Sequence, residues 1–123
     1  MIKIKHLLES VEPDDGKRIW VESIGLTKDL QEWCSVTHLL SNLGPPMTIW
    51  RWFQDHPEGY EYFRGKYHEF LSQGPRRKAL MHLANAGLQE DFTLLHQGDD
   101  PAHNSATALY EFLTELQTSC PPE

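Results

Sequence analysis

The sequence predicts a small α/β domain in which a sheet of about three strands, mixed or parallel, is covered by four or five helices. Two short segments near the N-terminus and a third at residues 92–96 are rich in β-branched and aromatic or large apolar residues. Elsewhere, apolar residues recur every three or four positions, which is the period of a helix packed on a core. No repeat or linker divides the 123 residues. We therefore expect one domain over residues 1–118 and a frayed tail at 119–123.

The first two strands are expected at residues 2–7 and 18–22. Apolar and charged residues alternate in the first segment, and the second reads Arg-Ile-Trp-Val-Glu. The intervening residues 12–16, Glu-Pro-Asp-Asp-Gly, have the composition of a turn. Because a parallel crossover normally needs a dozen residues or more, this short connection could form a hairpin.

Residues 27–43 carry an ambiguous pattern. One helically spaced set comprises Leu30, Trp33, Cys34 and Thr37, and a second comprises Val36, Leu39, Leu40 and Leu43. The Gly-Pro-Pro run at 44–46 ends this element, and a short helix is expected from about Met47 to Gln54.

Three more helices and the last strand follow. The first of these helices begins near Pro57 and closes at Gly74, and the next begins at Pro75 with Gly87 as its expected C-cap. The third strand occupies residues 92–96. Asp100 is then expected to cap the last helix, with Pro101 at its first position.

Composition argues against several classes of function. With 18 acidic and 11 basic residues, the net charge of −7 disfavours a general nucleic-acid binder. The N-terminus lacks the apolar core of a signal peptide, and no apolar run approaches the roughly 20 residues of a membrane span, so a cytoplasmic protein is expected. Cys34 and Cys120 form no CxxC motif, and the seven histidines show no familiar ligand spacing, so no metal or cofactor is predicted.

Three stretches of the chain together resemble the DUF488 family, in particular its YeaO-like branch. The N-terminal residues 2–5 and 13–22 are similar to "IxIKR…P-x-DGxRVLVD". Residues 44–67, with Trp52-Phe53 and His56-Pro57, resemble "APSxxLRKWF…DPxxWxEFRxRY". Residues 92–104, ending in His103-Asn104, resemble "VTLLYAARDxxHN". The resemblance implies a fold of this family and gives no settled biochemical role.

One departure from this resemblance concerns residues 22–28. Where the branch carries "DRLWPRG", this chain reads Glu-Ser-Ile-Gly-Leu-Thr-Lys, with both arginines, the Trp-Pro pair and the glycine not retained at their places. If those arginines stabilise charge in relatives, this chain lacks that function. The resemblance therefore implies a divergent member with altered or lost activity.

Candidate ligand-binding residues lie where the third strand leads into the last helix. Crevices at the carboxyl ends of strands are favoured ligand sites in α/β sheets, and a helix N-terminus offers free N–H groups. His103 could act as acid or base and Asn104 as an orienting group beside Asp99. Glu22 ends the second strand and is expected on the same rim. The simpler interpretations are a helix cap for Asp100, loop-tying contacts for His103 and Asn104, and a rim salt bridge for Glu22.

Two functional hypotheses follow. In the first, the chain binds a small anionic or nucleotide-like ligand at the rim formed by Glu22, Asp99, His103 and Asn104, and whether it is an enzyme stays open. In the second, it is a non-catalytic interaction module that uses an exposed aromatic helix surface. Adjacent residues on a helix point about 100° apart, so the aromatic run at 50–53 cannot bury every ring on one face. One of Trp50 and Trp52 is therefore expected to contact a partner protein, such as a second copy in a homodimer, or to cover the rim pocket.

Overall fold

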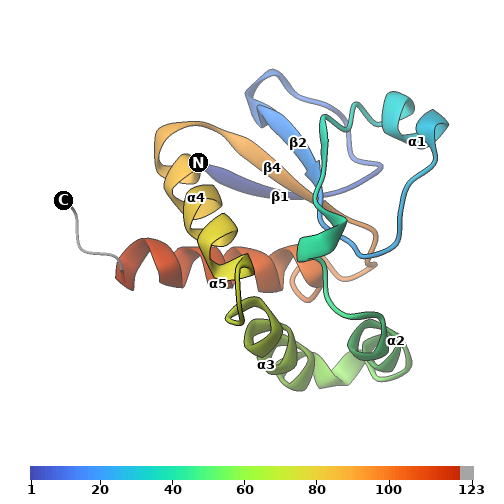
Figure 1. The fold of residues 1–123 in the computed structure, drawn as a ribbon. Coiled ribbons are helices and arrows are strands. Elements are labelled where there is room, and N and C mark those ends of the chain that lie inside the picture. The colour runs from blue at the N-terminus through green and yellow to red at the C-terminus, as the bar shows by residue number, and fades with distance from the viewer. Residues whose placement is uncertain (120–123) are drawn as a thin grey trace.

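The computed structural model describes residues 1–119, in which four parallel strands form one sheet in the order β1-β4-β2-β3. Figure 1 labels three of them, β1, β4 and β2. The strands are β1 (Ile2–His6), β2 (Lys17–Trp20), β3 (His38–Leu39) and β4 (Phe92–His96). All five residues of β4 are buried, as expected for a central strand with neighbours on both sides. The α/β class is confirmed, and the predicted count of three strands is one too low.

The additional strand, β3, lies within the segment that has helical spacing in the sequence. A helix does form there, but α1 (Lys28–Trp33) is only six residues long. Ser35 then adopts the left-handed conformation with φ of 54°, which ends the helix. The β-branched residues Val36 and Thr37 favour an extended backbone, and the chain continues alongside β2, pairing His38 with Ile19.

The suggested hairpin between the first two strands is wrong. β1 and β2 both run parallel to β4, one on each side, with Ile4 and Ile19 opposite the same residue, Leu94. Residues 7–16 carry the chain from the end of β1 back to the start of β2. Ten extended residues span roughly 33 Å, which is ample for the length of a five-residue strand. Thr93 Oγ1 donates to the Asp15 carbonyl at 2.8 Å, so this connection is tied to the central strand.

Four longer helices pack mainly in one layer beside the sheet (Figure 1). They are α2 (Met47–Asp55), α3 (Tyr60–Leu71), α4 (Arg76–Gln89) and α5 (Ser105–Ser119). α5 packs against β1 and β4, α3 packs against α5, and α2 contacts α3. With α1, the described residues form five helices, within the predicted range.

The predicted helix ends are shifted at two places. Gly87 lies inside α4 and is not its C-cap, because α4 continues to Gln89. A Cβ atom at Gly87 would lie 2.7 Å from the end of the Ile2 side chain, so the glycine leaves room for Ile2 of β1 to pack against α4. The last helix begins at Ser105, five residues after Asp100. Of the predicted tail at 119–123, Ser119 is the last residue of α5, and residues 120–123 lie outside the described part of the chain.

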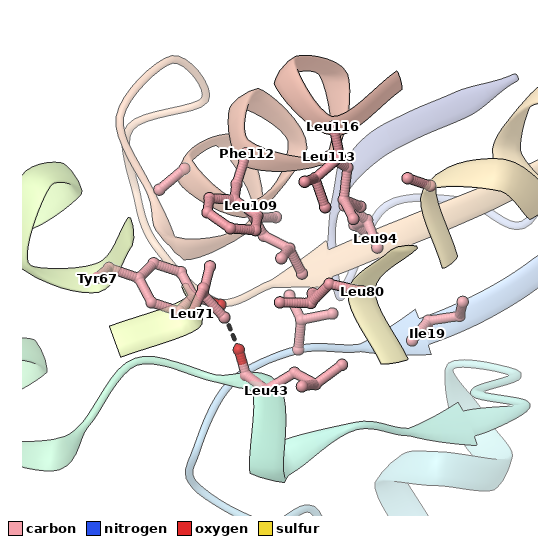
Figure 2. Packing of buried hydrophobic residues seen from close by; sticks show 14 of the residues in the cluster. Ile19, Leu43, Tyr67, Leu71, Leu80, Leu94, Leu109, Phe112, Leu113 and Leu116 are labelled. Atoms are coloured by element: carbon pink, nitrogen blue, oxygen red, sulfur yellow. Dashed lines mark hydrogen bonds between the residues drawn. The ribbon is translucent and has the colours of Figure 1, made fainter. Parts of the chain in front are cut away.

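Alternate residues of the strands supply two apolar cores, one on each face of the sheet. Ile19 and Leu94 face the helices and join a cluster with Leu71, Leu80 and Leu109 (Figure 2). In this cluster the hydroxyl group of Tyr67 donates to the Leu43 carbonyl at 2.5 Å. The period-two alternation of the strands therefore places each side chain in its core.

The second core is smaller and forms on the opposite face. It consists of Trp20, Leu95 and Cys34 together with Leu7. Cys34 is thus a small core residue, as predicted. Its neighbour Trp33 is 85% exposed, so the helical stripe expected to bury Leu30 and Trp33 together does not form. Among the described residues, every helix is too short or too polar to cross a bilayer.

Candidate functional site

A pocket of about 470 Å³ lies at the carboxyl edge of the sheet, between the ends of β2 and β4 and the helices α2 and α5. We call it the edge pocket. It is lined by Glu22, Trp50, Phe53, Gln54, Pro57, Gln97, Gly98, Asp99, Asp100, His103, Asn104 and Ser105. All four residues proposed from the sequence are in this set. They come together because parallel strands end at the same edge of a sheet, which is where ligands of α/β proteins usually bind.

Glu22 is a deeply buried acidic group of the edge pocket. It follows the end of β2 by two residues and is only 2% exposed. Its Oε2 accepts a hydrogen bond from the backbone N–H of Gln97 at 3.3 Å. Its Oε1 has no partner with hydrogen-bond geometry among the described residues, and the nearby Ser105 side chain interacts with the carboxyl group without forming such a bond to this oxygen. A buried acceptor without a partner costs about 1–3 kcal/mol, so the fold retains this arrangement at a cost.

Burial also affects the ionisation of Glu22. Loss of solvent raises the pKa of its carboxyl group above the ordinary value of 4.5. The Ser105 side chain and the Gln97 N–H act in the opposite direction, because both favour the ionised form. A carboxyl group with a raised pKa, bordering a pocket, is a functional-site candidate on physical grounds.

The position of Glu22 depends on a close approach of Gly44. A Cβ atom at Gly44 would lie 2.6 Å from the Ser23 nitrogen and 2.8 Å from the Glu22 carbonyl carbon. The hydroxyl group of Ser23 in turn donates to the Pro45 carbonyl. The Gly-Pro-Pro run that stops the preceding element in the sequence thus also fixes the backbone that carries Glu22.

Asn104, rather than Asp100, caps the last helix. Its Oδ1 accepts from the Thr107 N–H at 2.9 Å, and its carbonyl accepts from the Ala108 N–H. These are the two hydrogen bonds of an N-cap residue. Asp100 Oδ1 instead accepts from the Ala102 N–H at 2.9 Å, which closes a local turn. The predicted cap role of Asp100 is therefore wrong by four residues, and the loop between β4 and α5 is longer than expected.

His103 is half-exposed at the rim of the edge pocket. Its Nδ1 donates to Asp100 Oδ2 at 2.9 Å. The hydrogen bond from the Ala102 N–H, and secondarily this contact with His103, lower the pKa of Asp100. The His103 ring also lies 4.7 Å from the ring of Tyr60, whose hydroxyl group donates to Glu111 at 2.6 Å. The imidazole is thus oriented by a carboxylate on one side and by an aromatic ring of α3 on the other.

Asp99 borders two pockets. Besides the edge pocket, it lines a second pocket of about 340 Å³ with His6 and His96, the paired last residues of β1 and β4. The two imidazole rings meet edge to face, with centroids 5.5 Å apart. Burial, and secondarily the neighbouring His6, lower the pKa of His96 to about 4. His96 Nδ1 accepts from the Gly98 N–H at 3.0 Å, so the neutral ring carries its proton on Nε2.

Several residues of the edge pocket were not anticipated from the sequence. Gln97 and Gly98 directly follow β4, and the rule that ligands bind at strand ends would have singled them out. Phe53 and Gln54 come from α2, together with Trp50, which is one of the two tryptophans expected from the sequence to cover the rim pocket or contact a partner; Trp50 and Phe53 are the aromatic residues of the lining. The sequence marks these aromatic residues but does not show that α2 borders this pocket, because that depends on helix packing.

The chemistry of the lining is acidic and rich in acceptors. Three carboxylates, Glu22, Asp99 and Asp100, line the edge pocket, and no lysine or arginine does so among residues 1–119. Within the same part of the chain, no three histidine, cysteine, aspartate or glutamate residues converge to hold a metal ion. The arrangement can therefore accept hydrogen bonds from a ligand and stack a flat group on its aromatic wall.

The fold and this edge pocket define a small parallel α/β protein with a polar, aromatic-walled cavity at the carboxyl edge of its sheet. Over residues 1–120 the chain matches the family described as the inactive DUF488-N3 subclade, and it belongs to that family. The DUF488 assignment expected from the sequence is thereby confirmed.

The chain is also similar to proteins of two mycobacterial species. Proteins described as uncharacterised from Mycobacterium bovis and Mycobacterium tuberculosis are 29% identical to it over 76 residues. The matched segment covers 57% of this chain and 59% of each relative, so the chain spans less than two thirds of the length of these proteins. No solved structure matches the chain.

Proposed function

We propose that the chain is a non-catalytic binding protein whose edge pocket takes a small nucleotide-like ligand. The observation that carries this proposal is Glu22, which lines a pocket of about 470 Å³ and whose buried Oε1 has no hydrogen-bond partner among the described residues. Pockets of 300–1,000 Å³ with apolar walls and a few convergent polar groups are typical ligand sites. Trp50 and Phe53 supply apolar lining, and the loop between β4 and α5 supplies polar lining.

A binding role is favoured over catalysis by two observations. The family is described as inactive. In addition, the run at residues 22–28 lacks the arginines of the "DRLWPRG" motif, which could otherwise stabilise a developing negative charge. We also propose the finer placement beside the YeaO-like branch and a cytoplasmic location. The buried free thiol of Cys34 is in keeping with a reducing compartment.

Ligand binding is tested by NMR titration of the labelled protein with the four common ribonucleosides and their 5′-monophosphates. The proposal predicts that at least one compound shifts the Trp50 indole signal together with the backbone signals of Gln97 and His103. If no compound of the panel perturbs these signals up to about millimolar concentration, where even weak pocket ligands are detected, the proposal is wrong.

A second candidate function is protein interaction through an exposed apolar surface. Trp50 lines the edge pocket, and Trp52 stacks on His56 at 4.6 Å, so both predicted contact residues have neighbours within the chain. The larger exposed surface is at Trp33, 85% exposed, with Leu30 on α1 and Leu39 on the edge strand β3. Light scattering of the wild type and of Trp33→Ser tests this function. A wild-type dimer that the substitution dissociates supports self-association through this surface. If the wild type and the variant are both monomeric, self-association is wrong.

A further inference from the structure

We infer that the edge pocket selects an unphosphorylated planar nitrogen base, a nucleobase or nucleoside, whose N–H group donates to Glu22. This inference rests on the proposed function and narrows its ligand class. It depends on three features of the described residues: the open acceptor of Glu22, the occupied N-terminus of α5, and the sign of the charges around the pocket.

The first feature requires a donor on the ligand. Glu22 lines the edge pocket, and its buried Oε1 has no hydrogen-bond partner among the described residues. A ligand whose acceptor faced this oxygen would be repelled, whereas an N–H donor would satisfy it. Hydrogen bonds to carboxylates are about twice as strong as neutral ones. Amino and imino groups of bases are donors of this kind, and their rings match the flat walls of Trp50 and Phe53.

The second feature removes the usual seat for a phosphate. The N-terminus of a long helix attracts anions through its free N–H groups and partial positive charge. At α5, the N–H of Thr107 is already bonded to the Asn104 side chain. The Glu22 carboxyl group lies against Ser105, the first residue of the helix. A phosphate at this helix end would therefore find one N–H group already bonded and would lie beside the protein's own Glu22 carboxyl group.

The third feature makes a phosphate unfavourable elsewhere in the pocket. Asp99 and Asp100 line the rim, and the imidazole of His103 is directed to Asp100 at 2.9 Å. No lysine or arginine of residues 1–119 lines the pocket to balance these carboxylates. A doubly charged phosphate group at the rim would meet like charges within a few ångströms, a repulsion that salt weakens.

The test compares each nucleoside that binds with its 5′-monophosphate, by calorimetry at low and high salt. We expect the monophosphate to bind at least about fivefold more weakly at low salt and the gap to narrow in 0.5 M salt. Equal or tighter binding of the monophosphate would overturn the inference and leave the proposed pocket in place. Absence of binding by the whole panel would overturn both.

The role of Glu22 is tested with Glu22→Gln, which keeps the size of the side chain and removes the carboxylate. The affinity for the nucleoside should fall about tenfold, as expected for loss of one charge-assisted hydrogen bond. The ratio of the affinity for the nucleoside to that for its monophosphate should also decrease. Glu32→Gln removes an equal charge from an exposed position on α1 and should change neither quantity. If Glu22→Gln binds the nucleoside as tightly as wild type while remaining folded, the donor contact is wrong.

Discussion

Asp15 and Arg18 form an ion pair in which both side chains are almost completely buried. Arg18 Nη1 lies 2.7 Å from Asp15 Oδ2, and the two side chains are 2% and 1% exposed. Arg18 also donates through Nε to the Cys34 carbonyl at 3.0 Å. The pair fixes the return connection between β1 and β2, on which the parallel order of the sheet depends.

Loss of the two partners should have unequal effects. Asp15 keeps a second cation, since Lys5 Nζ lies 2.8 Å from its Oδ1, whereas Asp15 is the only carboxylate paired with Arg18 among the described residues. Asp15→Asn leaves a buried charge without its counterion and should lower the free energy of unfolding by about 3–5 kcal/mol. Arg18→Met should cost less. Urea unfolding measures both, and a larger effect of Arg18→Met would contradict the argument.

The N-cap of α5 gives a second stability prediction. Asn104→Ala removes the acceptor of the Thr107 N–H and should lower the free energy of unfolding by about 1–2 kcal/mol. Asn104→Asp keeps an acceptor at the same place and should retain most of the stability. Asp100→Ala is the matched control, because its side chain is bound in an exposed turn, and it should cost less than Asn104→Ala. The reverse order would restore Asp100 as the cap.

Glu22 should make the protein less stable as the pH rises from acid toward neutral. Burial raises the pKa of Glu22 in the folded chain above its ordinary value of 4.5. At a pH between 4.5 and the folded pKa, the unfolded chain therefore releases a proton that the folded chain retains. The contribution of Glu22 to the free energy of unfolding is therefore most favourable below pH 4.5. It is lost as the pH rises through the folded pKa of this group. Compared with wild type, Glu22→Gln should be relatively more stable at pH 7 than at pH 4. Chemical denaturation at both values measures the difference, and a constant difference would argue against the raised pKa.

His96 should have the opposite dependence on pH. Its folded pKa of about 4 lies below the ordinary value of 6.5, so the unfolded chain takes up a proton first as the pH falls. Stability contributed by the neutral ring is present above pH 6.5 and lost as the pH falls toward 4. The pKa difference corresponds to at most ~3 kcal/mol, an upper bound because solvent in the second pocket screens part of the charge.

The matching substitution is His96→Asn, whose side-chain oxygen can replace Nδ1 as acceptor of the Gly98 N–H. This variant should lose less stability than the wild type between pH 6.5 and pH 4. His82→Gln, at an exposed position on α4, should retain the wild-type dependence. If His96→Asn and His82→Gln respond to acid alike, the buried ring is not the source of the effect.

The sequence was informative where side chains alternate between two fixed environments. Ile19 and Trp20 point to opposite cores, and the pattern of residues 18–22 predicts this directly. Glu22 and His103 could be placed on one rim because strand ends share an edge in a parallel sheet. These inferences need only the local period and the general rule for ligand sites.

The remaining errors come from long-range packing. The pairing of β3 with β2 and the insertion of β4 between β1 and β2 depend on contacts between residues far apart in the chain. Trp33 has the spacing of a core residue but is exposed, because α1 ends at that residue and turns away. The unsatisfied oxygen of Glu22 depends on how β2, Gly44 and α5 meet, which no local pattern encodes.

The meeting of Gly44 with the end of β2 gives the last prediction. Gly44→Ala would place its Cβ 2.6 Å from the Ser23 nitrogen, and because this neighbour is backbone, residues 22–23 must shift. We expect a loss of about 1–3 kcal/mol in the free energy of unfolding, typical of overpacking, and weaker binding of any nucleoside that contacts Glu22. Gly65→Ala is the matched control, since Gly65 lies within α3 with no atom near the added Cβ, and it should raise stability by up to about 1 kcal/mol. Urea unfolding measures the stability of both variants, and NMR spectra report on the pocket through the signals of Gln97 and Trp50. If both substitutions leave the free energy of unfolding unchanged and Gly44→Ala does not shift these NMR signals, the close approach of Gly44 does not set the position of Glu22.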